Sequence, residues 1–580
     1  MVRTPASLPL TLFCSLTLFG TACTPSSMSD GSGGSSSGSG GSSNSGSGGQ
    51  SSGSGGSSSS GSGGSASSGG ATGSGGTSSS GSGGTNSSGS GGQASGSGGR
   101  GSGGTPATGS GGGTATGSGG HASGGATGTS SGGMTGSGSG GSGMTGSGGS
   151  GMTASCTFTQ SSSISTKIPT VGILTWSTSM ASPTSAKVDF GLTTDYGMTA
   201  PVDLKADMYK TLLLGMKASK MYHYRITVTG SDGSCASPDY TIMTGPLTNG
   251  LPSIKLSPAT ASATGLFGGF LITGQYVQGA GASGSPAYIL DADGDFVWWY
   301  NIGSDVTGAR MSYDGTHMWI NGANVPSGTV HVHRVSMDGM TDEDLSSKFG
   351  GQNHQLTVLP DETVAFYGYG SNGCDDIKEY SPATGMTKTI VNAKTAHGGT
   401  GACHLNNIEY WKADDSYVFS DLDNVCLTKI DRTGKTIWIA NGINGVTSTF
   451  SGDTWAGGEH GIHLLAADNF LIFNNNSRGG GVGASGGTGD GSIALEMKLD
   501  LTAKTMTKKW SYKASPGVQN DVMGDVQRMS NGNTIVGFST KGVLHEVDAS
   551  GKLLQTLTWP LGASFGYIEK RASLYGAPPK

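Results

Sequence analysis

The chain has 580 residues, of which 109 are glycine, and its 32 basic and 38 acidic residues give a net charge of −6. Glycine makes up about 7% of average protein sequence, so part of the chain is not ordinary globular sequence. The acidic balance, without a long basic run, excludes a nucleic-acid partner on electrostatic grounds. Outside the glycine-rich part the chain is rich in Thr, Val, Ile and Tyr with few runs of helical period, which predicts an all-β fold.

Residues 1–23 have the pattern of an export signal. Arg3 gives a positive start, Leu8 to Phe19 form an apolar run too short to span a bilayer, and three small residues precede Cys23. A cysteine at this point resembles the bacterial lipoprotein signal, which implies that Cys23 is lipidated and that two or more acyl chains anchor the protein. The alternative is an ordinary signal peptide with an incidental cysteine. We expect a lipid-anchored protein of the bacterial cell envelope, at the periplasmic face or the cell surface.

Residues 24–153 form a Gly/Ser-rich segment without any Trp, Tyr, Phe, Leu, Ile or Val. Such a segment buries too little apolar surface to offset its chain entropy, so we expect a disordered linker.

Cysteine usage after Cys23 fits an oxidising compartment. Five cysteines remain, and because the number is odd at least one stays unpaired: Cys156, Cys235, Cys374, Cys403 and Cys426. Cys156 opens the first folded domain and Cys235 lies near its end, so a disulfide between them is predicted. The sequence does not say which two of the other three pair. A zinc site from Cys374, Cys403 and His404 is a weaker alternative because the ligand spacing is wrong, and we predict no metal.

Residues 154–247 alternate as short strands separated by turns, which predicts a small β-sandwich. The strands include Val171–Trp176, Ala186–Gly191 and Met221–Val228. The Tyr-x-Tyr-Arg strand at Tyr222–Arg225 resembles that of a fibronectin type III-like module. Nothing in this domain has the pattern of a reactive site, so we expect it to space or cover the next domain.

Residues 250–580 repeat a strand–turn–strand unit six times. The copies are Tyr288–Trp298, Val332–Gly339, Ile377–Gly385, Leu427–Trp438, Leu495–Asp500 and Leu544–Gly551. Second hairpins with Asp or Asn turns lie between them, at Met311–Gly315, Leu359–Glu362, Ala413–Asp415, Ala467–Asn469 and Ser530–Asn533. Two hairpins per repeat make a four-stranded blade, so the sequence predicts a six-bladed β-propeller with a glycine-rich insertion at Gly479–Gly491.

Polar residues gather just before or at the first strand of several repeats. They are Asn353 with His354, His404 with Asn406, and Glu459 with His460. Equivalent positions of different blades converge at one mouth of the central channel, so we expect His354, His404 and His460 to form a site. His317, His331, His333 and His397 lack this register and are expected to be structural or exposed.

The same segments resemble the bacterial arylsulfate sulfotransferase family. The matching motifs are His404–Tyr410 with Asp414–Ser420, Glu459–Leu465 with Phe473–Asn475, Asn353–His354 with Leu359–Asp361, and Gly524–Arg528 with Asn531–Thr534. The resemblance implies a six-bladed propeller that moves sulfate from a phenolic ester to a phenol without a nucleotide donor or other cofactor. It implies that His460 is the nucleophile and becomes a sulfohistidine, while His354 and His404 bind sulfate oxygens or move protons.

One family residue is replaced in this chain. The family has an arginine after its Ser-Ser pair, and here Leu422 lies between Asp421 and Asp423. Arg478 is the cation predicted to take its place, together with Asn406 in substrate binding. The expected partner is a small aromatic sulfate or phenol. The alternative is a non-catalytic surface propeller that binds another ligand or a protein.

Overall fold

The computed structural model describes residues 156–259, 264–276, 284–324, 329–352, 354–477 and 487–578. The predicted export signal with Cys23, the predicted linker of residues 24–153, and Arg478 lie outside the described residues. Across the described ranges no helix is both long and apolar enough to cross a membrane. Strands dominate, which confirms the all-β prediction, and α1 (Ala393–His397) is a single short turn of helix.

The first domain is a sandwich of two antiparallel sheets. One sheet has the order β1 (Phe158–Ile164), β2 (Gly172–Thr178), β5 (Thr211–Leu213). The other contains β4 (Met198–Pro201), β3 (Ser185–Gly191), β6 (Met221–Gly230), β7 (Gly233–Ala236) and β8 (Tyr240–Met243). On β6 every second side chain, from Tyr222 to Val228, is buried against Trp176 and its neighbours, as expected of a strand with one solvated face. A disulfide joins Cys156 to Cys235. The fibronectin type III likeness stays a prediction.

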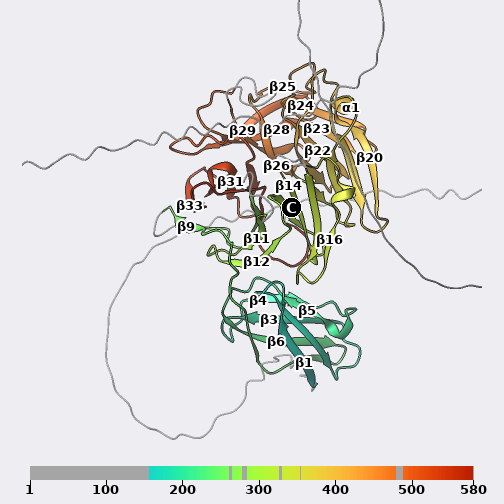
Figure 1. The fold of residues 1–580 in the computed structure, drawn as a ribbon, viewed down its shortest axis with the longest axis vertical. Helices are drawn as coiled ribbons and strands as arrows, with labels where there is room; N and C mark the ends of the chain where they lie inside the picture. The colour runs from blue at the N-terminus through green and yellow to red at the C-terminus, as the bar shows by residue number, and fades with distance from the viewer. Residues whose placement is uncertain are drawn as a thin grey trace, which may run out of the picture. The chain divides into compact units, whose positions relative to one another are not determined.

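The second domain is a six-bladed β-propeller (Figure 1). Blade 1 contains β10 (Phe270–Tyr276), β11 (Pro286–Leu290) and β12 (Phe296–Asn301). Blade 2 contains β13 (Val306–Met311), β14 (His317–Asn324), β15 (Thr329–Ser336) and β16 (Asp342–Asp344). Blade 3 contains β17 (Thr357–Val358), β18 (Val364–Gly368), β19 (Asp376–Ser381) and β20 (Met386–Asn392). All pairings within these blades are antiparallel.

Blades 4 to 6 follow the same plan. Blade 4 contains β21 (Leu405–Trp411), β22 (Ser416–Asp421), β23 (Cys426–Asp431) and β24 (Thr436–Asn441). Blade 5 contains β26 (Glu459–Ala466), β27 (Asn469–Asn474), β28 (Ile493–Asp500) and β29 (Thr505–Lys513), with β25 (Ser451–Gly452) at its outer edge. Blade 6 contains β30 (Asp525–Arg528), β31 (Thr534–Phe538), β32 (Val543–Val547) and β33 (Leu553–Thr558). The predicted hairpins are therefore the inner and outer strand pairs of these blades.

The two ends of the propeller sequence close the ring. β34 (Ser564–Phe565) and β35 (Glu569–Arg571), from the C-terminal segment, pair with β10 and form the innermost edge of blade 1. β9 (Lys255–Pro258) pairs with β33 and becomes the outermost strand of blade 6. Blades 1 and 6 therefore each contain strands from both ends of the propeller sequence, which joins the first blade to the last.

The recurrent outer turns have a local cause in the sequence. Asp431 Oδ1 accepts hydrogen bonds from the backbone N–H groups of Thr433 (2.9 Å) and Lys435 (3.0 Å). Gly434 has φ = +87°, a conformation that glycine adopts without a steric penalty. Asp548 repeats the arrangement with N–H bonds from two residues of its own turn. An aspartate followed three residues later by glycine therefore fixes the turn and the register of the hairpin.

The first strands of neighbouring blades contact one another, β21 with β26 and β26 with β30, so they surround the centre of the ring. Apolar side chains fill the space between adjacent sheets: one buried cluster contains Val418 and Leu427 of blade 4 with Ile472 and Met497 of blade 5. This packing holds the inner strands in place. The site described below is built on their beginnings.

Candidate active site

Three histidines from consecutive blades meet at one end of the inner strands. His354 precedes β17, His404 precedes β21, and His460 is the second residue of β26. The ring centroids of His354 and His404 are 5.7 Å apart, and those of His354 and His460 are 5.6 Å apart. The ring of Tyr567 lies 6.3 Å from that of His354. The structure thus brings together the three histidines singled out from the sequence, and we call them the histidine trio.

Two glycines let β26 carry His460 into this position. A side chain on Gly461 would place its Cβ 1.9 Å from Asp525 Oδ1, so only glycine permits β26 to approach β30 so closely. The Gly461 N–H donates to Gly524 O (3.0 Å), which fixes this approach. Gly458 in turn packs on Leu422, where a Cβ would lie 1.7 Å from Leu422 Cδ1.

Asn475 determines which nitrogen of His460 carries the proton. Asn475 Nδ2 donates to two carbonyl oxygens, Asn520 O (2.7 Å) and Met523 O (2.9 Å), which orients the amide. Its Oδ1 then faces His460 Nδ1 at 2.5 Å and accepts a hydrogen bond from it. Because Nδ1 donates, the neutral ring keeps its lone pair on Nε2. The geometry therefore leaves Nε2 of His460 as the nucleophilic atom.

All three histidines are neutral around pH 7. Burial lowers the pKa of His460 to about 3, although the hydrogen bond to Asn475 opposes this shift. Burial also lowers the pKa of His354 well below its ordinary value, with further contributions from His460 and His404. The pKa of His404 is lowered by burial despite the nearby Asp421 carboxylate. None of the groups that produce these shifts is a lysine or an arginine.

A buried network supports His404 from behind. Asp421 Oδ1 accepts a hydrogen bond from the His404 backbone N–H (3.1 Å), and Asp421 Oδ2 contacts Nε2 of the fully buried His397 ring (3.0 Å). Asn424 Nδ2 donates to the same carboxylate (2.8 Å). His397 comes from α1, outside the register of the blades, which is why the sequence pattern did not place it near the trio. Its contact with Asp421 positions the segment that carries His404.

The cysteines next to this network are paired. A disulfide joins Cys374 to Cys403, the residue before His404, and Cys426 is free and buried. Cys403 Sγ also lies near His397 and Asp421, a grouping that would suit a metal ion if the sulfur were a thiolate. With both sulfurs in a disulfide, the weaker zinc alternative for Cys374, Cys403 and His404 lacks its thiolate ligands.

Asn406 connects the histidine-bearing segments of blades 4 and 5. Its Nδ2 donates to Glu459 O (2.8 Å), and its backbone carbonyl accepts a hydrogen bond from the Tyr567 hydroxyl (2.5 Å). Its Oδ1 is buried and has no hydrogen-bond partner among the residues that the structure describes. A buried oxygen of this kind is suited to accept a hydrogen bond from a hydroxyl group.

The acidic residues around the trio carry less charge than their number indicates. Glu459 is fully buried, and burial raises its pKa well above the ordinary value; Trp455 Nε1 donates to its Oε2 (3.1 Å). The pKa of Asp423 is raised to about 7 by burial and by Asp421. Leu422 is 8% exposed and apolar where the family arginine is expected. Arg478, predicted to replace that arginine, lies outside the described residues.

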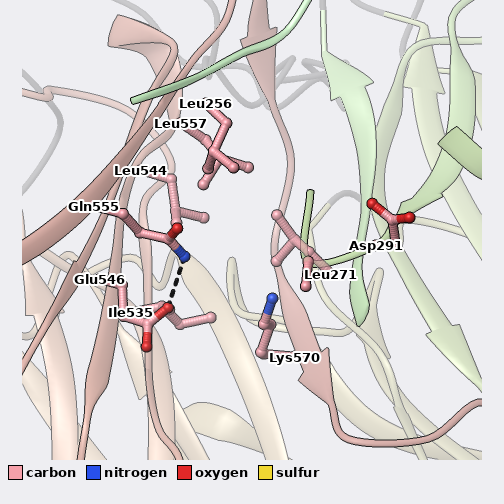
Figure 2. Close-up of a pocket in the computed structure, with 10 residues that line it drawn as sticks. Leu256, Leu271, Asp291, Ile535, Leu544, Glu546, Gln555, Leu557 and Lys570 are labelled. Carbon is pink, nitrogen blue, oxygen red and sulfur yellow. Dashed lines mark hydrogen bonds between the residues drawn. The ribbon is translucent and has the colours of Figure 1, made fainter. Parts of the chain in front are cut away.

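Two other titratable clusters involve the propeller, and the lysine of the first, Lys217, comes from the first domain. Lys217 Nζ lies between the carboxylates of Asp291 (3.1 Å), Asp293 (2.6 Å) and Asp295 (2.7 Å), where a metal ion would otherwise fit. Figure 2 shows a small pocket between blades 1 and 6 in which the Lys570 side chain lies among Leu271, Asp291 and Glu546. Its volume of about 10 Å³ holds about one water molecule.

Fold and site define a six-bladed propeller with a trio of neutral histidines at one end of its channel. Residues 375–559 match the family model described as Arylsulfotransferase (ASST), a segment that contains His404 and His460. This match confirms the resemblance to the arylsulfotransferase family that the sequence predicted, over the part of the propeller from blade 3 to blade 6.

Comparison with solved structures finds other propellers at low identity. TolB from Acinetobacter baumannii is 11% identical with a TM-score of 0.36, covering 61% of this chain and 81% of TolB. The β-propeller domain of Cps50 (Swd1) from Myceliophteria thermophila is 10% identical with a TM-score of 0.33, covering 52% of this chain and 89% of that domain. At these TM-scores neither likeness carries an argument about function. No curated protein matches this chain.

Proposed function

We propose that this protein transfers sulfate from a phenolic sulfate ester to a phenol through a covalent sulfohistidine on His460. The family match indicates an arylsulfotransferase-like function. The observation that supports the mechanism most directly is the hydrogen bond from His460 Nδ1 to Asn475 Oδ1, which leaves the Nε2 lone pair for attack on sulfur.

The transfer divides into two displacements. In the first, His460 Nε2 forms a bond to sulfur, the bond between sulfur and the aryl oxygen breaks, and the phenolate leaves with the electron pair. The positive charge gained by the ring is stabilised through the Nδ1–H bond to Asn475. In the second, the oxygen of the acceptor phenol bonds to sulfur, and the electron pair of the S–N bond returns to Nε2.

One proton must move for the reaction to balance. The acceptor phenol loses its proton and the departing phenolate gains one. Because the phenolate leaves in the first displacement, it takes its proton from solvent. In the second displacement the neutral ring of His354 or His404 takes the proton of the acceptor phenol and returns it to solvent. The unpartnered Oδ1 of Asn406 orients the acceptor by accepting a hydrogen bond from its hydroxyl group before transfer.

The charge of the sulfuryl group is met by donors rather than by the missing arginine. An N–H group on each of His354 and His404 can donate to a sulfuryl oxygen in a buried site, where such bonds are stronger than in water. The raised pKa values of Glu459 and Asp423 reduce the repulsion that two ionised carboxylates would impose. Arg478 is the further cation that we assign to sulfate binding.

We also propose that the protein is exported and lipid-anchored through Cys23. The pattern of residues 1–23 and the two disulfides support this proposal, because disulfides persist in oxidising compartments. Radiolabelled palmitate incorporation tests it: the parent chain is labelled, and a Cys23→Ser variant is not. Label that persists in Cys23→Ser would exclude Cys23 as the anchor.

The activity is tested with para-nitrophenyl sulfate and a set of phenol acceptors, following release of nitrophenol. The parent chain and a His223→Ala control in the sandwich turn over, whereas His460→Ala does not. Absence of turnover in the parent chain with every acceptor rejects the proposal.

The second candidate is a non-catalytic propeller that binds a ligand or protein at the cell surface. It is favoured by one observation: apolar Leu422 packs on Gly458 at the position where the family has a cation. If this candidate holds, His460→Ala leaves ligand binding unchanged within a few-fold, and no sulfated peptide forms.

A further inference from the structure

A second and larger cavity occupies the opposite end of the channel. Its volume is about 550 Å³, and all six innermost strands or the turns after them contribute to its wall. Its wall contains the basic residues Arg310 and Lys412, the acidic residues Glu409, Asp525 and Glu569, and the aromatic residues Tyr313 and Trp411. Lys412 Nζ lies 5.9 Å from the centre of the Tyr313 ring. A cavity of this size is in the range of sites for small molecules.

The inner strands separate this cavity from the histidine trio. β21 begins directly after His404, and Glu409 and Trp411 lie near its other end. At about 3.3 Å per residue, five residues of strand place the backbones of His404 and Glu409 about 16 Å apart. Asp525 is nearer to the trio, because it lies against Gly461, the residue after His460, so the cavity extends from the opposite end of the channel towards the sulfate-transfer site.

Two carboxyl groups in the cavity share one arginine. Arg310 Nη2 lies 3.9 Å from Glu409 Oε1 and 4.0 Å from Asp525 Oδ2, too far for a hydrogen bond to either. Its Nη1 donates to a backbone carbonyl, that of Ile568, at 2.5 Å. Glu569 has its own partner in Arg571, whose Nη1 lies 3.3 Å from Glu569 Oε1. Gln355 Nε2 donates to Glu409 Oε1 (3.0 Å) and two backbone N–H groups donate to Asp525, so within the described residues this pair has neutral donors and one shared cation.

Burial is the main cause of the raised pKa values of Glu409 and Asp525, and Arg310 offsets it only in part. Burial raises the pKa of Glu409 to about 7 even though Arg310 opposes the shift, and the Asp525 and Glu569 carboxylates add to it. Burial raises the pKa of Asp525 to about 6 against the same arginine. The neighbouring His463 supplies no charge at pH 7, because burial and then Arg310 lower its pKa to about 4. A cation placed between Glu409 and Asp525 would favour the ionised form of both.

Aromatic and aliphatic side chains surround the acidic groups. Tyr313 comes from the turn after β13, while Tyr410 and Trp411 come from the end of β21. Ile462 and Leu464 of β26 supply apolar wall. Aromatic faces attract organic cations in addition to excluding water from the apolar part of a ligand. Inorganic cations gain nothing from such a wall.

We propose that this cavity binds a small organic ammonium ion with an aromatic or aliphatic body, the ammonium group lying between Glu409 and Asp525 and the body against Tyr313 and Trp411. Glu409, Tyr313 and Trp411 lie towards the end of the channel remote from the histidine trio, and the proposed binding does not depend on sulfate transfer. In the bound state the ammonium donates hydrogen bonds to the two carboxylates and supplies the missing positive charge.

The test is titration calorimetry of the full chain with 2-phenylethylammonium, a probe that has no phenol hydroxyl and so is no sulfate acceptor. The comparison ligands are neutral 2-phenylethanol and anionic phenylacetate. We expect one-to-one binding of the ammonium probe, about tenfold or more tighter than that of either comparison ligand. Because ionised Glu409 is the binding form, affinity is expected to rise between about pH 6 and pH 8.

The variants separate this site from the rest of the protein. Glu409→Gln removes the charge at nearly constant shape and is expected to weaken binding about tenfold or more. Glu343→Gln, the same change at a half-exposed glutamate of β16, leaves binding unchanged. Tyr313→Leu weakens binding through loss of the aromatic wall, and thermal melting checks that each variant folds. His460→Ala leaves binding of the ammonium probe within about twofold.

Three results would overturn the proposal. The first is that the ammonium probe binds no more tightly than 2-phenylethanol. The second is that phenylacetate binds more tightly than the ammonium probe, which would make Arg310 the recognition group. The third is that His460→Ala abolishes binding while Glu409→Gln does not, which would move the probe to the histidine trio. None of these results depends on whether the protein transfers sulfate.

Discussion

Replacing Asn475 with leucine tests the assignment of His460 Nε2 as the nucleophilic atom. The substitution keeps the approximate shape of a side chain that is 1% exposed and removes three hydrogen bonds. The two carbonyls keep other donors: Asn520 O accepts from Ser492 Oγ (3.1 Å), and Met523 O accepts from Asn520 Nδ2 (2.9 Å). Only the Nδ1–H group of His460 loses its single partner.

The expected stability loss is therefore that of one buried donor, about 1–3 kcal/mol. For a folded part of this size such a loss lowers the melting temperature by only about 1–4 °C. The effect on activity is larger. Without Asn475 the neutral ring exchanges between tautomers and loses its fixed orientation, and a nucleophile misplaced by about 1 Å loses about 100-fold in rate.

The assay is turnover of para-nitrophenyl sulfate alongside thermal melting. The matched control is Asn469→Leu at the start of β27, the strand that Asn475 follows. Asn469 Nδ2 donates to Glu496 Oε1 (2.9 Å) at the end remote from His460. We expect Asn475→Leu to lose about 100-fold in turnover and Asn469→Leu to stay near the parent rate. Equal turnover in both variants would refute the tautomer argument.

Three further predictions concern stability. Burial raises the pKa of Glu459 well above its ordinary value, so ionisation destabilises the folded chain as pH rises above about 4.5. We therefore expect Glu459→Gln to melt like the parent at about pH 4 and at a higher temperature than the parent at about pH 8. Equal melting temperatures of variant and parent at both pH values would contradict this. Burial lowers the pKa of Lys570 to about 8, so Lys570→Met should stabilise the chain by about 1–3 kcal/mol at neutral pH. This gain in stability should shrink as pH rises from about 8 to 10. The same substitution at the exposed Lys552 should give no gain. Replacing both Cys374 and Cys403 with serine opens a loop of 29 residues, which should lower the free energy of unfolding by about 3–4 kcal/mol in chemical denaturation. A decrease in the free energy of unfolding below about 1 kcal/mol would count against the disulfide.

The blades and the histidine trio could be predicted from the sequence because their signals are local. Aspartate and glycine at fixed spacing set each outer turn, as at Asp431 and Gly434, and the repeat then places His354, His404 and His460 at equivalent positions. Closure of the ring by β9 and β35 pairs segments about 300 residues apart, and no short-range pattern indicates it.

The supporting groups of the site depend on tertiary contacts. Asn475 is visible in the sequence as part of a family motif, but its hydrogen bond to His460 follows from the backbone carbonyls that orient its amide. His397 reaches Asp421 from α1, outside the repeat. The cavity around Arg310 and Glu409 has no sequence signal, because its charged groups come from different blades.

The covalent role of His460 is tested by detecting the sulfohistidine itself. The full chain is mixed with para-nitrophenyl sulfate without an acceptor, quenched in alkali, digested, and analysed by mass spectrometry. We expect the peptide containing His460 to gain the mass of one SO₃ group, a phenol acceptor to remove this group, and His460→Ala to carry none. Nitrophenol release with no SO₃ on His460, or with the label on His354 or His404 instead, would contradict it.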